Sequence, residues 1–320
     1  MKKILVVGGA GYIGAHIAWL LQEGGYQVRI YDDFSNGLKS RVEGKFEDVV
    51  IGDVLDRKLL VDSLAGIDGV IHLAAKKAVG ESVSNPLKYY ENNVGGTLNI
   101  LAAMSVNGVK NLIFSSTAAV YSPSEKLAIS EDDLTEPLSP YGQTKLLAEK
   151  LISNVASAEG LSAISLRYFN VVGSLKDEFG DNSKDNLVPK VFAALKSGAE
   201  PEIYGDNYPT KDGTCIRDYI HVGDLAEAHI LALEQVFKSK VNEIYNVGSG
   251  DGYSVTEMIS QISKTIGKTL TPKIVARRAG DTAQLIASIS KIARDLGWRP
   301  KYTLKEMIDS AWQAESRSRL

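Results

Sequence analysis

The chain opens with a short apolar run that ends in a cluster of glycines, and this arrangement restricts the fold more than any other feature. Residues 4–7 read Ile-Leu-Val-Val, which predicts a buried strand and is too short for a signal-peptide core or a membrane span. Residues 8–14 then read Gly-Gly-Ala-Gly-Tyr-Ile-Gly and open an amphipathic segment. Glycines allow a tight turn and bring backbone N–H groups close to a pyrophosphate, which a helix N-terminus stabilises. We therefore predict a dinucleotide-binding turn; a glycine-rich turn without a ligand is the alternative.

The composition excludes several classes of partner and site. The 320 residues are 44% hydrophobic and 23% charged with a net charge of -3, so no strong field attracts nucleic acid or an acidic membrane surface. Cys215 is the single cysteine, which excludes an intramolecular disulfide or a cysteine-based zinc site and favours a reducing compartment, by default the cytoplasm. The four histidines, His16, His72, His221 and His229, lack metal-ligand spacing.

Short apolar runs alternate with longer amphipathic segments through the first half of the chain. The predicted strands are 3–7, 27–31, 48–51, 69–73, 111–115 and 162–168, and the predicted helical stretches include 16–22 and 87–107. This order predicts an α/β fold with a Rossmann-type, doubly wound parallel sheet. Beyond Gly173 the runs become shorter and more irregular, so we predict an NAD-binding domain over 1–172 and a smaller α/β substrate-binding lobe over 173–320, with segments that can interleave.

An acidic residue at the end of the second predicted strand indicates which dinucleotide is bound. Asp32 lies eighteen residues beyond Gly14, where a carboxylate accepts hydrogen bonds from the adenosine ribose. It would repel the 2′-phosphate of NADP, and no arginine follows it directly, so NAD is favoured. The alternative is a surface loop aspartate. Asp53, after the third strand, is a candidate for the adenine edge or a helix cap.

Residues 139–145 read Ser-Pro-Tyr-Gly-Gln-Thr-Lys and predict a helix start that carries an acid/base pair. Ser139 suits the N-cap and Pro140 the first helical position, so Tyr141 and Lys145 lie one turn apart on one face. The phenol has an ordinary pKa of roughly 10, and we expect the Lys145 ammonium and a positive nicotinamide ring to lower it. Thr117, just past a strand, offers a hydroxyl beside Tyr141. The alternative for Tyr141 and Lys145 is a solvated surface pair, and the alternative for Thr117 is a strand-end cap.

Seven segments together resemble one protein family over nearly the whole chain. They are residues 8–14, 72–82, 89–94, 141–145, 166–170, 217–222 and 296–298. On these segments the chain resembles the extended short-chain dehydrogenases/reductases and, within them, the UDP-glucose 4-epimerase family. The glycine turn and the Tyr/Lys pair occur across the superfamily, whereas segments 77–82 and 217–222 are more specific to the epimerase branch.

The resemblance implies a set of site residues. It places Thr117, Tyr141 and Lys145 as catalytic. It places around NAD the residues Gly8, Gly11, Tyr12, Ile13, Gly14, Asp32, Asn36, Asp53, Val54, Leu73, Ala74, Ala75, Lys77, Asn92, Tyr141, Lys145 and Phe169. It places around the nucleotide sugar Lys77, Thr117, Tyr141, Asn170, Asn186, Leu187, Tyr204, Arg217, Arg278 and Asp281. Arg217 and Arg278 would pair with the UDP diphosphate; an interdomain salt bridge with Asp218 or Asp281 is the alternative for either.

The resemblance also implies an activity: a cytoplasmic UDP-hexose 4-epimerase, as a homodimer, that interconverts UDP-galactose and UDP-glucose through a 4-keto intermediate with tightly bound NAD. UDP-GlcNAc/GalNAc and UDP-pentose 4-epimerases are alternatives. Leu285 stands where some relatives carry a bulky tyrosine, which predicts room for an N-acetylated sugar. The loop 173–180 departs from the family pattern, so the substrate residues near it are less firmly assigned.

Two further classes of protein share this fold and its cofactor. The 4,6-dehydratases resemble one another in having an acidic pair just after the active-site threonine, and decarboxylases have a glutamate there. This chain has Ala118 and Ala119 at these positions, which argues against both activities. A non-catalytic NAD-sensing protein would have no reason to keep Thr117, Tyr141 and Lys145 together.

Overall fold

A computed structural model describes residues 1–124, 126–278 and 281–317. These residues form two compact units that interleave along the chain. The first unit comprises Met1–Ser122, Leu134–Arg167 and Ala226–Tyr245, and the second comprises Pro123–Asp133, Tyr168–Leu225 and Asn246–Leu320. The domain boundary between residues 172 and 173 stays a prediction.

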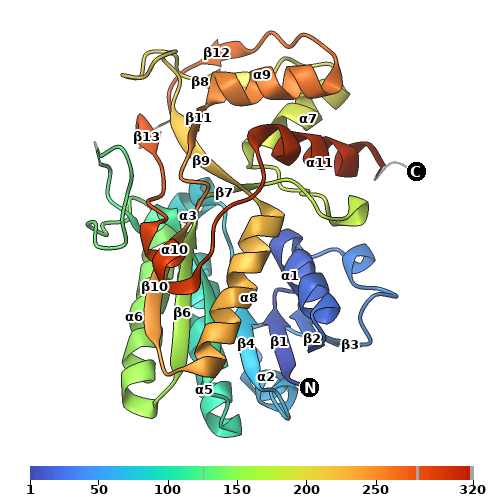
Figure 1. Cartoon of the computed structure of the whole chain (residues 1–320), viewed down its shortest axis with the longest axis vertical. Coiled ribbons are helices and arrows are strands. Elements are labelled where there is room, and N and C mark those ends of the chain that lie inside the picture. The colour runs from blue at the N-terminus through green and yellow to red at the C-terminus, as the bar shows by residue number, and fades with distance from the viewer. Residues whose placement is uncertain (125, 279–280, 318–320) are drawn as a thin grey trace. The chain divides into compact units, whose positions relative to one another are not determined.

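The first unit is built on a seven-stranded sheet with the strand order β10-β6-β5-β4-β1-β2-β3 (Figure 1). The pairs β1–β2, β1–β4, β2–β3 and β4–β5 are all parallel. The strands are β1 (Lys3–Val7), β2 (Gln27–Asp32), β3 (Asp48–Ile51), β4 (Gly69–His72), β5 (Asn111–Thr117), β6 (Ser162–Tyr168) and β10 (Asn242–Val247). The predicted Rossmann-type fold class is confirmed.

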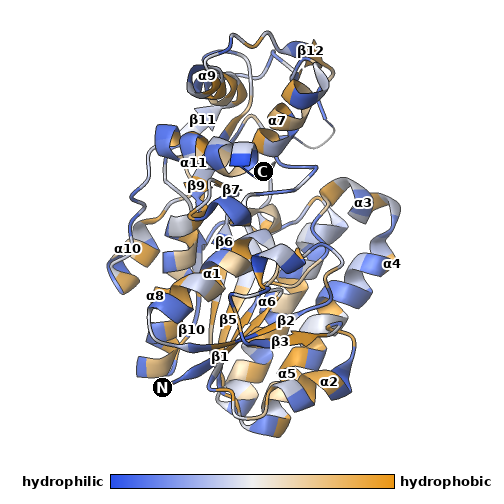
Figure 2. Cartoon of the chain, turned by 90° about the vertical axis from the view of Figure 1, so that its right-hand side faces the viewer, coloured by the Kyte–Doolittle hydropathy of each residue, from blue (hydrophilic) through white to orange (hydrophobic). Residues whose placement is uncertain are grey.

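Helices cover both faces of this sheet. On one face α2 (Arg57–Ser63), α5 (Gly96–Asn107) and α6 (Pro140–Glu159) bury Leu60, Ile100 and Ile152 against strand residues such as Leu5 and Phe114. Helices α1 (Tyr12–Glu23) and α8 (Val222–Lys238) lie over the other face (Figure 1). Because both faces are covered, the central strands are almost uniformly hydrophobic, as Figure 2 shows.

The second unit contains shorter strands around β9 (Ile216–His221). It pairs with β7 (Asn170–Val172), β11 (Gly252–Ser254) and β13 (Gln284–Leu285). A separate pair joins β8 (Glu202–Tyr204) to β12 (Lys273–Val275). Three amphipathic helices, α7 (Leu187–Ser197), α9 (Val255–Ile266) and α11 (Leu304–Arg317), bury Phe192, Met258 and Ile308 in one apolar core. Helix α10 (Ser290–Leu296) and the short η4 (Asp177–Phe179) also belong to this unit, whereas the short helices α3 (Val79–Ser84), η1 (Lys39–Arg41) and η3 (Ala118–Val120) belong to the first.

Two elements differ from the sequence prediction. The predicted continuous helix over 87–107 is α4 (Pro86–Tyr89), a π-helix η2 (Tyr90–Gly95) and then α5. At the last junction a Cβ on Gly96 would lie 2.6 Å from Val54, so this close approach requires glycine. Strand β10 was not predicted, because polar residues interrupt its apolar run; the buried Asn246 is satisfied by a hydrogen bond to the Ile129 carbonyl.

Candidate active site

The glycine turn joins β1 to α1 in a conformation that only glycine fits. Gly8 has a φ of 85°, and a Cβ there would lie 2.7 Å from the backbone nitrogen of Ala74. A Cβ on Gly14 would lie 2.2 Å from the Gly8 carbonyl oxygen. Gly11 is the N-cap of α1, and no side chain caps this helix end. The first turn of α1 therefore presents backbone and the positive end of the helix dipole, which suits a pyrophosphate.

Asp32 ends β2 beside this turn. Its carboxylate accepts hydrogen bonds from the backbone N–H of Ala10 at 2.9 Å and of Phe34 at 2.8 Å. Burial raises the pKa of Asp32, and these two hydrogen bonds oppose the rise. The interpretation as an exposed loop aspartate is wrong, because the side chain is buried against the turn.

An arginine that the sequence did not single out also belongs to this region. Arg41, in η1, is fully buried, and its Nη1 donates to the Ala10 carbonyl at 3.3 Å. Its charge lowers the pKa of Asp32 slightly. Because the guanidinium is buried under the turn, it is not exposed to solvent as a binding group for a 2′-phosphate.

The other predicted dinucleotide residues of the first unit follow strand ends. Asp53 accepts from the N–H of Leu55 at 2.9 Å, whereas Asp56 caps α2 by accepting from Leu59, so Asp53 is not the helix cap. Asn36 and Lys77 are exposed, and Asn92 lies in η2. The remaining predicted residues form the turn itself or follow β3 and β4: Tyr12, Ile13, Val54, Leu73, Ala74 and Ala75.

Asn93, next to Asn92 in the π-helix, was missed in the sequence. Its side chain is buried, accepts from the N–H of Lys76 at 2.8 Å and donates to the Lys76 carbonyl and the Thr144 hydroxyl, both at 3.0 Å. It therefore fixes the backbone just before Lys77 against α6. π-helical turns often occur at functional sites, but nothing in a single sequence marks one.

Tyr141, Lys145 and Thr117 come together as predicted. Ser139 caps α6 through a 3.2 Å hydrogen bond from the N–H of Gly142, and Pro140 is the first helical residue. Tyr141 and Lys145 are both buried, which excludes a solvated surface pair. The Thr117 side chain hydrogen-bonds Tyr141, and it also caps η3 by accepting from Ala119 at 3.1 Å.

The electrostatics of this pair differ from the expectation. Burial raises the pKa of Tyr141, and the hydrogen bond with Thr117 partly opposes this. Burial also lowers the pKa of Lys145 to about 7, against the opposing effect of the Glu149 carboxylate. Lys145 Nζ donates to the Ser115 carbonyl at 2.7 Å and lies 4.7 Å from the centre of the Phe114 ring. In the chain by itself the pKa of Tyr141 is therefore raised, because desolvation dominates. A lowering by Lys145 together with a positive nicotinamide ring stays a prediction.

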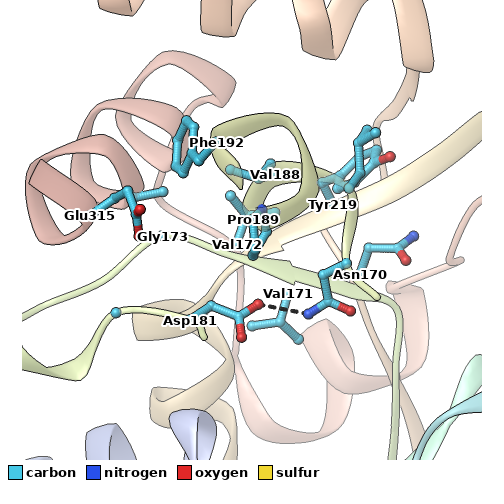
Figure 3. Close-up of a pocket in the computed structure, with 14 residues that line it drawn as sticks. Asn170, Val171, Val172, Gly173, Asp181, Val188, Pro189, Phe192, Tyr219 and Glu315 are labelled. Carbon is cyan, nitrogen blue, oxygen red and sulfur yellow. Dashed lines mark hydrogen bonds between the residues drawn. The ribbon is translucent and has the colours of Figure 1, made fainter. Parts of the chain in front are cut away.

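The predicted substrate residues lie in the second unit, and three of them line one cavity. Asn170, Asn186 and Leu187 line a pocket between β7, α7 and α11, and Figure 3 shows Asn170 and Asp181 among its lining residues. Asn186 donates to Asp181 at 2.7 Å, and Asn170 donates to the Asp218 carbonyl at 3.0 Å. The apolar wall of this cavity includes Val172, Val188, Pro189 and Phe192. Phe169, just before β7, is buried, and its N–H donates to Val247.

The two predicted phosphate-binding arginines have different environments. Arg217, on β9, donates from Nη1 to the Thr282 carbonyl at 2.8 Å and pairs with Asp281 at 3.4 Å. Both of these partners belong to the second unit, so the pair is not a salt bridge between units. Arg278 is exposed and stacks 3.7 Å over the ring of Tyr204.

Asp218, the other acidic partner considered for the arginines, is instead held by backbone. It accepts from the N–H groups of Ser249, Gly250 and Ala287. Burial raises its pKa to about 6, and these hydrogen bonds oppose the rise.

Among the residues that the structure describes, no group of three or more His, Cys, Asp or Glu side chains is placed to hold a metal ion. Within the same residues, no helix combines the length and the apolar character needed to cross a membrane.

Comparison with protein-family models matches residues 4–248 to the NAD dependent epimerase/dehydratase family. The chain belongs to this family. A relative in it, the UDP-glucose 4-epimerase of Corynebacterium glutamicum, is 44% identical over 314 residues, which cover 97% of this chain and 94% of that protein.

Solved structures agree with this membership of the epimerase/dehydratase family. The UDP-glucose-4-epimerase of Stenotrophomonas maltophila, with bound NAD and formylated UDP-arabinopyranose, has a TM-score of 0.95 at 38% identity and covers 100% of this chain and 99% of that one. The UDP-Glc/GlcNAc 4-epimerase of Campylobacter jejuni has a TM-score of 0.86 at 36% identity, with 99% and 100% covered.

Proposed function

We propose that this protein is a UDP-hexose 4-epimerase that interconverts UDP-galactose and UDP-glucose with tightly bound NAD. The observation that carries the proposal is the buried group of Tyr141, Lys145 and Thr117 in a chain whose relatives at about 40% identity are UDP-glucose 4-epimerases. The Tyr141 phenol is buried, hydrogen-bonded to a threonine hydroxyl and one helical turn from a buried lysine. Such a phenol can act as a general acid/base toward a sugar hydroxyl.

NAD fits the residues present. The uncapped N-terminus of α1 suits the pyrophosphate, and Asp32 suits the adenosine ribose. NAD, when bound, supplies an acceptor and donor of hydride for C4 of the sugar.

The protein's own residues handle the proton and the nucleotide. Tyr141 removes the proton of the 4-hydroxyl as C4 loses its hydride and returns the proton as the hydride comes back, so that no net oxidation results. Thr117 holds the Tyr141 phenol through its hydrogen bond. In its protonated form, Lys145 favours the phenolate of Tyr141 over the phenol. Arg217 and Arg278 hold the diphosphate while the 4-keto sugar turns to present its other face.

The alternative activities are distinguished by particular residues. Elimination of water needs its own acid and base after Thr117, but Ala118 and Ala119 form η3 there. This disfavours a 4,6-dehydratase. Leu285 lies opposite Arg217 in the pairing of β13 with β9, and its modest size favours acceptance of an N-acetyl group as well.

The test is to incubate the purified protein with UDP-galactose, without added cofactor, and to resolve the products. UDP-glucose is the expected product, and Tyr141→Phe is expected to slow its formation by at least about a hundredfold. A 4-keto-6-deoxy sugar, or no turnover by folded protein that contains NAD, would overturn the proposal.

The homodimer and the cytoplasmic location are part of the proposal. Leu98 and Val106 on α5 and Leu147 on α6 are apolar side chains that are 52%, 66% and 40% exposed. Helices α5 and α6 pack side by side, so these residues supply an apolar surface that a second copy of the chain would cover. The single cysteine fits a reducing compartment.

A further inference from the structure

A buried network in the first unit connects β5 to α6 beneath the reacting group. Glu149 lies one helical turn beyond Lys145, and its carboxylate accepts a hydrogen bond from the Ser116 hydroxyl. Arg167, on β6, donates to both carboxylate oxygens, from Nε at 2.9 Å and from Nη2 at 2.6 Å. All three side chains are at most 4% exposed.

Further contacts hold Arg167 in place. Its Nη1 donates to the Tyr121 hydroxyl at 3.0 Å, and its guanidinium lies 4.9 Å from the centre of the Tyr121 ring. The Arg167–Glu149 contact is bidentate and charge-assisted, which fixes direction as well as distance. A buried ion pair contributes little net stability compared with apolar residues of the same size, so stability alone is a poor reason for this network.

Ser116 occupies the position between two residues that act at the reacting group. The carbonyl of Ser115 accepts the hydrogen bond from Lys145, and the side chain of Thr117 hydrogen-bonds Tyr141. The Ser115 hydroxyl bonds His229 at 2.9 Å, so the end of β5 is also tied to α8. A shift of Ser116 would therefore move both contacts at once.

We propose that Glu149 is a positioning residue. Arg167 orients its carboxylate, which holds Ser116 in place, and Ser116 in turn fixes the positions of its neighbours, so that Thr117 can hydrogen-bond Tyr141 and the Ser115 carbonyl can accept from Lys145. This inference rests on the proposed epimerase function. Sequence alone gives one hint, because Tyr141, Lys145 and Glu149 are spaced four apart on one face of α6.

The Glu149 carboxylate also acts on Lys145 by its charge. It raises the pKa of Lys145 against the larger effect of burial. His72, on β4, is a second titratable side chain that interacts with Lys145. Burial lowers the pKa of His72 to about 3, so His72 carries no charge at neutral pH.

The first variant is Ser116→Ala, which removes the link and leaves the ion pair intact. We expect kcat for UDP-galactose to fall about tenfold with KM within about twofold, because small misplacements at the reacting group are costly. Ser162→Ala is the matched control. Ser162 is also a buried serine of the first unit, and its hydroxyl bonds the Ser239 carbonyl and the Val241 N–H at the start of β6. It is expected to lower Tm to a similar degree and to leave kcat unchanged.

The second variant is Glu149→Gln, read out as the pH dependence of kcat. Lys145 loses a neighbouring negative charge while the Arg167 charge stays, so the alkaline limb of the profile is expected to move to lower pH. A Ser116→Ala kcat equal to that of the unaltered chain, or a Glu149→Gln profile that superimposes on it, would overturn the inference. An inactive unaltered chain would instead overturn the proposed function, and the inference with it.

Discussion

Replacing Lys145 with methionine should change how the stability of this protein depends on pH. Burial lowers the pKa of Lys145 from its ordinary value of 10.5 to about 7. Between these two values the folded protein binds fewer protons at this group than the unfolded chain does, so its free energy of unfolding rises with pH. Lys145→Met keeps the length of the side chain and removes the titrating group, so this part of the pH dependence disappears in the variant.

The size of the effect follows from the two pKa values. The free energy of unfolding of the wild type, relative to that of Lys145→Met, should grow by roughly 2 kcal/mol between pH 7 and pH 9. The variant also loses the 2.7 Å hydrogen bond to the Ser115 carbonyl, so the comparison uses the change of stability with pH and not the stability at one pH.

Urea denaturation of nucleotide-free protein at several pH values measures this difference. Lys150→Met, at an exposed position of α6, is the control and should follow the wild-type curve. If the stabilities of wild type and Lys145→Met change in parallel with pH, the buried ammonium holds its proton as an exposed lysine does, and the argument from desolvation is wrong.

Three further predictions concern the substrate and the assembly. Arg278→Ala should raise KM for UDP-galactose about tenfold with little change in kcat, since it removes charge-assisted hydrogen bonds to the diphosphate; steady-state kinetics with an unchanged KM would contradict that role. Leu285→Tyr should lower the preference for UDP-GlcNAc over UDP-glucose, measured as the ratio of kcat/KM values, by roughly tenfold; an unaltered ratio would remove Leu285 from the sugar site. Leu98→Glu should shift the protein from dimer to monomer in sedimentation analysis, because it places a charge on the apolar surface of α5 and α6; a dimer that persists would place the interface elsewhere.

Much of the central sheet could be predicted because its strands are covered on both faces. Such strands are continuous apolar runs, and the glycines after β1 and the Ser139-Pro140 helix start are local signals. Strand β10 escaped prediction because Asn242, Glu243 and Asn246 break its apolar run, and their partners are distant in sequence.

The parts of the site that sequence reasoning missed depend on contacts between distant segments. Glu149 and Arg41 look like ordinary surface charges in the sequence, yet both are buried. The role of Glu149 is apparent only in the fold, where β6 brings Arg167 to it. The burial of Arg41 is apparent only where η1 packs under the glycine turn. The raised pKa of Tyr141 was not expected for a related reason, since spacing along a helix gives proximity but not the loss of solvent around both groups.

The wide turn at Tyr90–Gly95 limits how this region of the chain can vary in length. A π-helix accommodates one residue more than the α-helix that would otherwise occupy its place. Deleting one residue there would let the turn tighten into an α-helix, and side chains within the turn would shift around the helix axis by up to about 100°. Asn93 could not then keep its hydrogen bonds to both Lys76 and Thr144. Insertions and deletions should therefore be tolerated in the loops around this helix far better than within it.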